Sequence, residues 1–390
     1  MKRNVSKLLA IVMTLALVMS FAAVSAAAVD YTATNGGSTS FEKNLVVDST
    51  AQIPNVEFEF TIEAGTPVPG GADNALEIKA GPVTASAPTI ESAQFTSGMT
   101  TTAGTPEDET DTTKKFAVDD VVIDLTGVTF TAPGVYRYVI TETATTLSGV
   151  TNDANAVRYL DLFVFPSEED PTELEVTTYS LRDTATSFER VPDADHPGQY
   201  KYQYVTNPTV KTSGYTNELE TVDLEFTKAI TGNQADKNKQ FKFTLALTDV
   251  NPGLYTVEVS RADVVKEDSN VTANEGVYTI EVPANSTSAT AYFYLADGDT
   301  VAVKDLPVGY GYTVTEDAED YESTAANVPN YTDPYTDTDV EDDAATSYTN
   351  DRTGIIPTGV IIMIAPFAIG LFVFGAIILY MVSKRRRVAY

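Results

Sequence analysis

The sequence predicts an all-β fold, arranged as two tandem immunoglobulin-like β-sandwich domains. Between residues 30 and 350, short runs rich in Val, Thr, Tyr and Phe are separated by Gly, Pro, Asn and Asp. In runs such as 56–62 and 159–165, apolar and polar residues alternate, which predicts strands with one buried and one exposed face. This region contains no long stretch with the 3.6-residue period of a helix. Many short strands separated by turns are typical of β-sandwiches.

The N-terminus has the pattern of a secretory signal peptide. Lys2, Arg3 and Lys7 precede an apolar stretch at 8–23, and the small residues that follow at 24–28 match a cleavage site. The apolar stretch is too short for a membrane span. We therefore expect residues 1–28 to be removed and the mature chain to be exported.

The C-terminus combines an apolar run with a basic tail. Residues 360–382 carry no charge, and as a helix they are long enough to cross the roughly 30 Å hydrocarbon core of a bilayer. The cluster at 384–387 is Lys-Arg-Arg-Arg, which marks the cytoplasmic side of a membrane. We expect a transmembrane helix at 360–382, with everything before it outside the cell.

Composition excludes several classes of function. The chain has 25 Lys and Arg against 55 Asp and Glu, a net charge of −30, which argues against nucleic acid and anionic membranes as partners. It has no cysteine, so disulfides, cysteine nucleophiles and thiolate metal sites are excluded. We expect no cofactor, no metal site and no enzymatic activity toward a separate substrate.

Three short signatures occur twice in the same order, which indicates a duplicated domain. They are Phe-x-Lys followed by Phe-x-Phe, then Tyr-x-Tyr-x-(Ile/Val)-Thr-Glu, then Tyr-Thr-Asn. The copies lie at 41–43, 58–60, 136–142 and 215–217, and again at 226–228, 241–243, 310–316 and 348–350. We place the boundary between the copies near residues 218–221. The expected parts of the chain are a signal peptide at 1–28, domains at 29–219 and 220–351, and a C-terminal segment at 352–390.

The polar residues of the repeats predict an unusual buried chemistry. Lys43 shares a strand face with Phe41, and Glu142 shares one with Tyr138; Lys228 and Glu316 repeat this arrangement. If these faces are the core, burial lowers the pKa of the lysine and raises that of the glutamate. A neutral lysine is a nucleophile, and a protonated carboxyl beside an asparagine can polarise its carbonyl group. The product is a Lys–Asn isopeptide bond, and a buried Lys–Glu ion pair is the simpler alternative.

These motifs resemble the backbone pilins of Gram-positive bacteria, with an FctA-like N-terminal domain and a Cna-B-like second domain. In that family each domain carries an autocatalytic bond between a lysine on the first strand and an asparagine on the last, with a glutamate beside it. The resemblance implies the clusters Lys43, Glu142, Asn217 and Lys228, Glu316, Asn350. Asn207 is a rival for Asn217, and Lys242 is a rival for Lys228.

The pentapeptide Ile-Ile-Pro-Thr-Gly at 355–359, followed by the apolar run and basic tail, resembles a sortase sorting signal. The resemblance implies cleavage between Thr358 and Gly359 and transfer of Thr358 to an amine. In the resembled pilins this amine is a lysine shortly before the asparagine, which points to Lys211, with Lys201 next. The tryptophan-containing pilin motif of other backbone subunits is absent, because the chain has no tryptophan.

The resemblance implies a cell-surface pilus subunit in the cell wall of a Gram-positive bacterium. The implied partners are a sortase, further copies of the chain and peptidoglycan, with the membrane involved only before sorting. A host or surface ligand is a further candidate partner. The alternative is a wall-anchored adhesin or minor pilin that is not polymerised.

Overall fold

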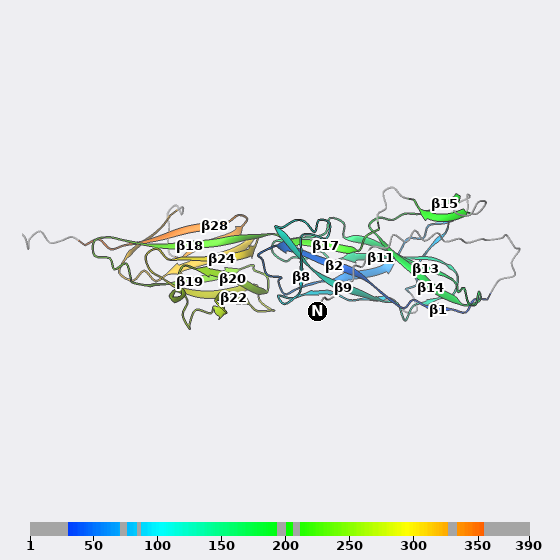
Figure 1. Cartoon of the computed structure of the whole chain (residues 1–390), viewed down its shortest axis with the longest axis horizontal. Coiled ribbons are helices and arrows are strands. Elements are labelled where there is room, and N and C mark those ends of the chain that lie inside the picture. Colours follow the sequence, from blue (N-terminus) through cyan, green and yellow to red (C-terminus); the bar gives the residue numbers. More distant parts are fainter. Residues whose placement is uncertain are drawn as a thin grey trace, which may run out of the picture.

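The computed structural model describes residues 30–70, 76–83, 87–192, 200–205, 211–326 and 334–354. These residues form two all-β domains that follow one another along the long axis of the molecule (Figure 1), as the sequence predicted. The expected signal peptide and residues 355–390, with Thr358, Gly359 and the expected span, lie outside the described residues. Within the described part of the chain, no helix is long and apolar enough to cross a membrane.

The first domain has two main sheets with its hydrophobic core between them. One sheet contains, in spatial order, β14 (Leu174–Arg182), β13 (Val157–Pro166), β11 (Gly134–Glu142) and β4 (Phe60–Ala64), with β5 (Ile78–Ala80) also paired to β11. The other contains β12 (Val150–Thr151), β17 (Gly214–Leu219), β2 (Ser38–Asp48), β9 (Lys114–Asp124) and β6 (Thr89–Ile90), with β8 (Thr101–Ala103) also paired to β9. Three further pairs are β1 (Thr34–Asn35) with β10 (Thr129–Phe130), β3 (Val56–Phe58) with β7 (Ala93–Phe95), and β15 (Phe188–Pro192) with β16 (Tyr200–Tyr204).

The second domain is also a two-sheet sandwich around one core. Its larger sheet has the order β21 (Thr272–Asn274), β22 (Val277–Val282), β20 (Gly253–Val259), β24 (Thr300–Pro307), β18 (Thr221–Thr231), β28 (Ala344–Asp351) and β26 (Glu322–Ala326). Its smaller sheet has the order β23 (Ser288–Leu295), β19 (Phe241–Thr248), β25 (Tyr310–Glu316) and β27 (Tyr335–Val340). A short 3-10 turn, η1, spans Ala262–Val264.

Both domains place their first long strand beside their last strand in parallel. In domain one β2 pairs with β17, and in domain two β18 pairs with β28. The register is also repeated: Lys43 lies opposite Tyr215, and Lys228 lies opposite Tyr348. The asparagine of each Tyr-Thr-Asn motif is therefore two residues beyond the lysine's partner, on the same face of the sheet. The duplicated motifs thus occupy equivalent places in the two sheets.

The expectation of one exposed face is wrong for residues 159–165. In β13 every residue from Leu160 to Phe165 is buried. The reason is a second layer, because the outer face of this sheet packs against the β15–β16 hairpin in a small separate cluster of apolar side chains, namely Ile78, Val135, Phe163, Phe165 and Phe188. The Asp161 carboxylate is buried as well, and it pairs with Arg137 of β11, Nε to Oδ1, at 2.6 Å. A strand covered on both sides does not alternate between buried and exposed residues.

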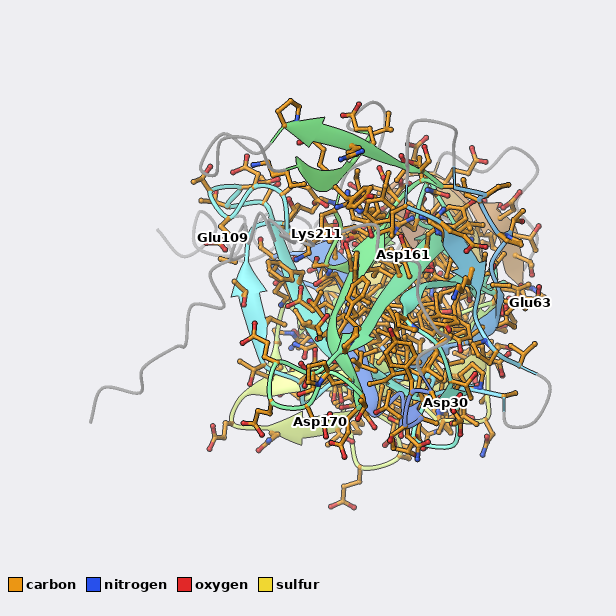
Figure 2. The ribbon with its side chains drawn as sticks, turned by 90° about the vertical axis from the view of Figure 1, so that its right-hand side faces the viewer. Asp30, Glu63, Glu109, Asp161, Asp170 and Lys211 are labelled. Atoms are coloured by element: carbon orange, nitrogen blue, oxygen red, sulfur yellow. The ribbon has the colours of Figure 1, made fainter. Side chains whose placement is uncertain are left out.

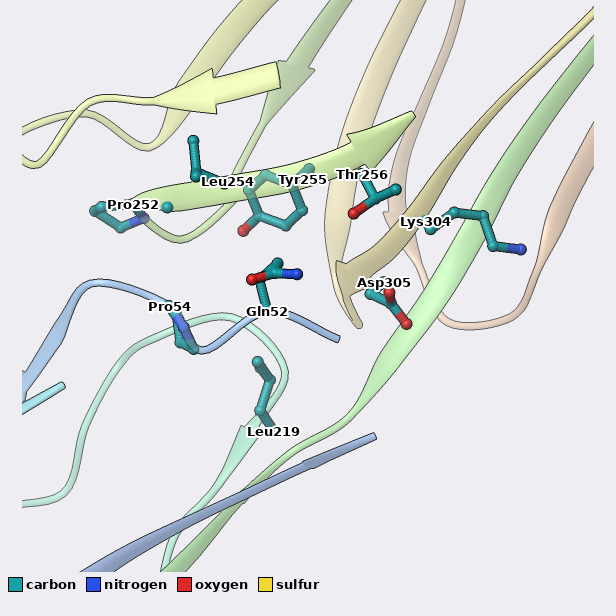
Figure 3. Close-up of a pocket in the computed structure, with 10 residues that line it drawn as sticks. Gln52, Pro54, Leu219, Pro252, Leu254, Tyr255, Thr256, Lys304 and Asp305 are labelled. Carbon is teal, nitrogen blue, oxygen red and sulfur yellow. The ribbon is translucent and has the colours of Figure 1, made fainter. Parts of the chain in front are cut away.

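Backbone contacts join the two domains at their junction. The Asn55 N–H donates to the Pro252 carbonyl at 2.7 Å, and the Glu220 N–H donates to the Gly149 carbonyl at 2.8 Å. Gly149 has a φ of +69°, and a Cβ atom there would lie 2.6 Å from the Glu220 carbonyl oxygen, so this approach requires glycine. The pocket in Figure 3 lies at the same junction and is lined from both domains, by Gln52, Pro54, Leu219, Pro252, Leu254, Tyr255, Thr256, Lys304 and Asp305 among others.

Candidate functional site

A lysine, a glutamate and an asparagine meet in the core of domain one. Lys43 comes from β2, Asn217 from the neighbouring strand β17, and Glu142 from β11 in the facing sheet. Lys43 Nζ lies 2.6 Å from Glu142 Oε1, and Asn217 Nδ2 donates to the same oxygen at 3.0 Å. All three side chains are buried. The structure therefore brings together the three residues that the sequence analysis assigned to this domain.

Domain two contains the same cluster. Lys228 of β18 lies with its Nζ 2.7 Å from Glu316 Oε1, and Asn350 Nδ2 donates to that oxygen at 2.8 Å. All three are buried, with Lys228 at 1% exposure. The two clusters thus have the same residue types, the same strand positions and the same Lys–Glu and Asn–Glu contacts in domains with different sequences.

The aromatic residues of the repeated motifs enclose each lysine. The first phenylalanine of each Phe-x-Phe motif lies over the ammonium, with Lys43 Nζ 4.7 Å from the Phe58 ring centroid and Lys228 Nζ 5.0 Å from that of Phe241. The second phenylalanine, Phe60 or Phe243, is the strand partner of the glutamate. This arrangement explains why Phe-x-Phe recurs with the lysine and glutamate motifs, because it excludes water from the cluster.

Burial changes the protonation of these groups. It lowers the pKa of Lys43 to about 8, against the opposing attraction of Glu142, and it lowers the pKa of Lys228 to about 8 in the same way. The pKa of the Glu142 carboxyl is raised, mainly because burial disfavours its charged form. In domain one these two shifts bring the pKa values of amine and carboxyl closer together, which lowers the cost of moving the proton from Lys43 to Glu142. The neutral amine that results is a nucleophile adjacent to an amide.

The alternatives to Lys228 and Asn217 are Lys242 and Asn207. Lys242 is on the side of β19 that faces away from the core, where its Nζ lies 4.1 Å from the Tyr292 ring centroid and its side chain is 40% exposed. Asn207 lies outside the described residues. Lys228, and not Lys242, is therefore the lysine in contact with Glu316. In domain one Asn217 contacts Glu142, and Asn207 stays an alternative.

The two candidate intersubunit lysines lie on the surface of domain one. Lys211 is exposed and forms an isolated bridge with Arg182 at the end of β14, three residues before β17. Figure 2 views the molecule along its long axis from the domain-one end and labels Lys211 there, with Glu63, Glu109 and Asp170 around the rim. Lys201 is half-buried on β16.

Sequence reasoning missed the residues that support the clusters. In domain one the Asp153 N–H donates to Asn217 Oδ1 at 2.8 Å, and in domain two the Ser323 hydroxyl donates to Glu316 Oε2 at 2.9 Å. Asp153 lies in an Asn-Asp-Ala-Asn turn, which is a recognisable turn signal but contains nothing that links it to a residue 64 positions later. In the described ranges no group of His, Cys, Asp and Glu side chains is arranged to hold a metal ion.

Two family models match parts of the chain. Residues 39–188 match FctA, described as a Spy0128-like isopeptide containing domain, a range that includes Lys43 and Glu142 but ends before Asn217. Residues 222–352 match a domain of unknown function, DUF7601, and this range includes all three residues of the second cluster.

The chain is also similar to characterised proteins of Streptococcus pyogenes. It is 29% identical over 395 residues to a pilin of serotype M1, which covers 97% of this chain and 99% of that protein. It is 31% identical over 138 residues to the pilus tip adhesin Cpa, 35% of this chain and 18% of that protein. The crystal structure of a point mutant of the S. pyogenes major pilin is 23% identical, with a TM-score of 0.49 over 82% of this chain and all of the other. Over nearly its whole length the chain is therefore similar to a streptococcal pilin, and within it residues 39–188 match the FctA, Spy0128-like isopeptide containing domain.

Proposed function

We propose that the protein is the backbone subunit of a cell-surface pilus, polymerised covalently by a sortase and crosslinked inside each domain by a Lys–Asn isopeptide bond. It is a structural protein of a Gram-positive cell surface. The observation that carries the proposal is the duplicated buried cluster of lysine, glutamate and asparagine. We assign one bond to each domain, at 29–219 and 220–351.

The chemistry at each cluster follows from its contacts. The neutral lysine Nζ attacks the side-chain Cγ of the asparagine, and negative charge develops on Oδ1. The glutamate accepts a proton from Nζ and donates one to Nδ2, to which it is already hydrogen-bonded. The Cγ–Nδ2 bond breaks, ammonia leaves, and an amide joins Lys43 to Asn217 or Lys228 to Asn350.

Head-to-tail polymerisation suits the directions of the strands. β17 runs toward the junction and is followed by β18, so Lys211 lies at the end of β17 that faces away from domain two. β28 is parallel to β18 and runs away from the junction, which takes Gly354 to the opposite end. At about 3.3 Å per residue these two ends are roughly 60 Å apart. An acyl group carried by Thr358 and an amine on Lys211 of the next copy would therefore join subunits end to end.

Intact-mass measurement of the exported region, residues 29–354, tests the internal bonds. Two bonds predict a mass about 34 Da below the sequence value, because each releases one ammonia of about 17 Da. Glu142→Ala is expected to halve the deficit, and Glu142→Ala with Glu316→Ala to abolish it. A wild-type mass equal to the sequence value rejects the bonds and leaves two buried ion pairs.

A second candidate function is a wall-anchored adhesin or minor pilin that is attached to peptidoglycan without polymerising. The similarity to part of a pilus tip adhesin favours it. Wall extracts of the producing bacterium distinguish the two, because a backbone subunit gives a ladder of SDS-resistant high-mass species. Lys211→Ala should abolish the ladder, with Lys201→Ala as the matched control. A ladder that persists in Lys211→Ala and disappears in Lys201→Ala would reassign the linkage to Lys201.

A further inference from the structure

The two clusters differ in what contacts the asparagine carbonyl. In domain one, Asn217 Oδ1 accepts the Asp153 backbone N–H at 2.8 Å. A backbone N–H can only donate, so this contact fixes which end of the amide faces Asp153 and which faces Glu142. In domain two, Asn350 Oδ1 has no hydrogen-bond partner among the described residues. The shared chemistry of the clusters does not account for the extra donor in domain one.

The Asp153 side chain holds this donor in place. Its Oδ2 accepts the Thr216 N–H at 2.8 Å, one residue before Asn217, and accepts Arg158 Nη2 at 2.9 Å. Arg158 is itself buried, and its Nε donates to the Gly214 carbonyl at 3.0 Å. The turn before β13 is thereby attached to β17 on both sides of Tyr215. The Asp153 carboxylate positions its own N–H against the amide of Asn217.

We propose that the Asp153 N–H stabilises the oxyanion that forms on Asn217 Oδ1 during isopeptide formation, and that the Asp153 carboxylate is a positioning residue for this step. The proposal rests on the proposed function and adds a role to the site. When Lys43 Nζ bonds to Cγ, the carbonyl electron pair moves to Oδ1, which already accepts the Asp153 N–H at 2.8 Å. When Nδ2 leaves as ammonia, the pair returns and the C=O bond reforms. A preorganised donor at such an oxygen contributes more in the transition state than in the ground state.

The test measures the rate of bond formation in nascent protein. The exported region is synthesised in a cell-free system, and samples are digested over time to quantify the Lys43–Asn217 and Lys228–Asn350 crosslinked peptides separately. Asp153→Pro removes the N–H, Asp153→Ala keeps it but removes the carboxylate, and Asp153→Asn keeps acceptors for Thr216 and Arg158. We expect Asp153→Pro to slow the first crosslink by a factor of about 100 or more. Asp153→Ala should slow it less, and Asp153→Asn should restore most of the rate. The Lys228–Asn350 crosslink is the internal control and should form at the wild-type rate throughout.

A second measurement separates this role from a purely structural one. Glu142→Ala prevents the bond, so the Tm of domain one in that background reports only what Asp153 contributes to folding. If Asp153→Ala slows crosslinking while leaving this Tm within a few degrees, the proposal is supported. If the rate falls only in proportion to a loss of Tm, or if Asp153→Ala and Asp153→Pro crosslink as fast as wild type, it is overturned. Should Asp153→Pro fail to fold, the Ala and Asn variants decide. Absence of the Lys43–Asn217 peptide from wild type would instead reject the proposed function.

Discussion

Removal of Asn217 is expected to lower the free energy of unfolding of domain one by an amount that depends on the length of the loop that the Lys43–Asn217 bond closes. A bond between Lys43 and Asn217 closes a loop of about 175 residues, and chain-entropy arithmetic borrowed from disulfides gives roughly 5 kcal/mol for such a loop. Asn217→Ala removes this bond but leaves the Lys43–Glu142 pair, 2.6 Å apart, in place. For a domain of this size, about 5 kcal/mol corresponds to a fall in Tm of roughly 10 to 20 °C.

The assay combines mass and calorimetry on the exported region. Asn217→Ala should lose half of the mass deficit and show a separate, lower-temperature transition for domain one, with domain two unchanged. Asn44→Ala is the matched control, because Asn44 is buried one residue from Lys43 on the opposite face of β2 and outside the cluster. It removes a buried amide without removing a bond, so it should keep the full mass deficit.

Two results would refute the reasoning. If the wild type shows the mass deficit but Asn217→Ala melts within a few degrees of it, the crosslink does not constrain the unfolded chain as assumed. If Asn44→Ala lowers the Tm as much as Asn217→Ala does, the loss reflects buried amide contacts rather than the bond.

Two further predictions concern protonation and the outer layer of domain one. The rate of the Lys43–Asn217 crosslink should rise with pH and level off above about pH 8. Below the raised pKa of Glu142 the pair holds two protons and the amine is not nucleophilic, whereas above about pH 8 the amine is neutral and Nζ itself supplies the proton that Glu142 passes to ammonia. Cell-free synthesis across this range measures it, and a rate that falls again above about pH 9 contradicts this proton relay. Asp161→Asn should cost about 3 to 5 kcal/mol in denaturant unfolding of the Asn217→Ala background, because it leaves Arg137 buried without its charged partner, 2.6 Å away. The exposed Lys242–Asp268 pair is the control, and Asp268→Asn should change stability by less than about 1 kcal/mol; equal effects at the two sites would show that the Arg137 pair contributes no more than a surface pair.

The sequence predicted the two clusters because duplication gives each residue a second, independent occurrence. Lys43 and Lys228 both follow a phenylalanine by two positions, and Asn217 and Asn350 both end a Tyr-Thr-Asn motif. In both domains the first and last strands pair in parallel with the same register, so the lysine of one motif lies opposite the tyrosine of the other. This pairing brings together residues that are far apart in the chain. The spacing of residues within a strand shows which side chains share a face of the sheet. Because both copies repeat the same spacings, the same three residue types could be assigned to a cluster in each domain.

Features that occur in one domain only were beyond such reasoning. Asp161 and Arg137 alternate with apolar residues and therefore look exposed, but the β15–β16 hairpin covers them, and nothing local to β13 or β11 predicts that second layer. The Asp153 turn looks like an ordinary loop because its contacts with Thr216 and Asn217 depend on the pairing of distant segments. Tertiary contacts without a repeat leave no pattern in a single sequence.

The topology gives the two proposed bonds different mechanical roles. Under the proposed linkage, a pulling force enters at Lys211, follows β17 through the junction into β18, and reaches Lys228. There the bond to Asn350 passes the force directly to the end of β28, so residues 229–349 bear none of it. In domain one the force runs along β17 alone, and residues before Lys211 are not on its path. The Lys43–Asn217 bond instead fastens the domain to the loaded strand, which resists shear of β17 away from β2. One bond therefore carries the load in series, and the other keeps a folded domain attached to the strand that carries it.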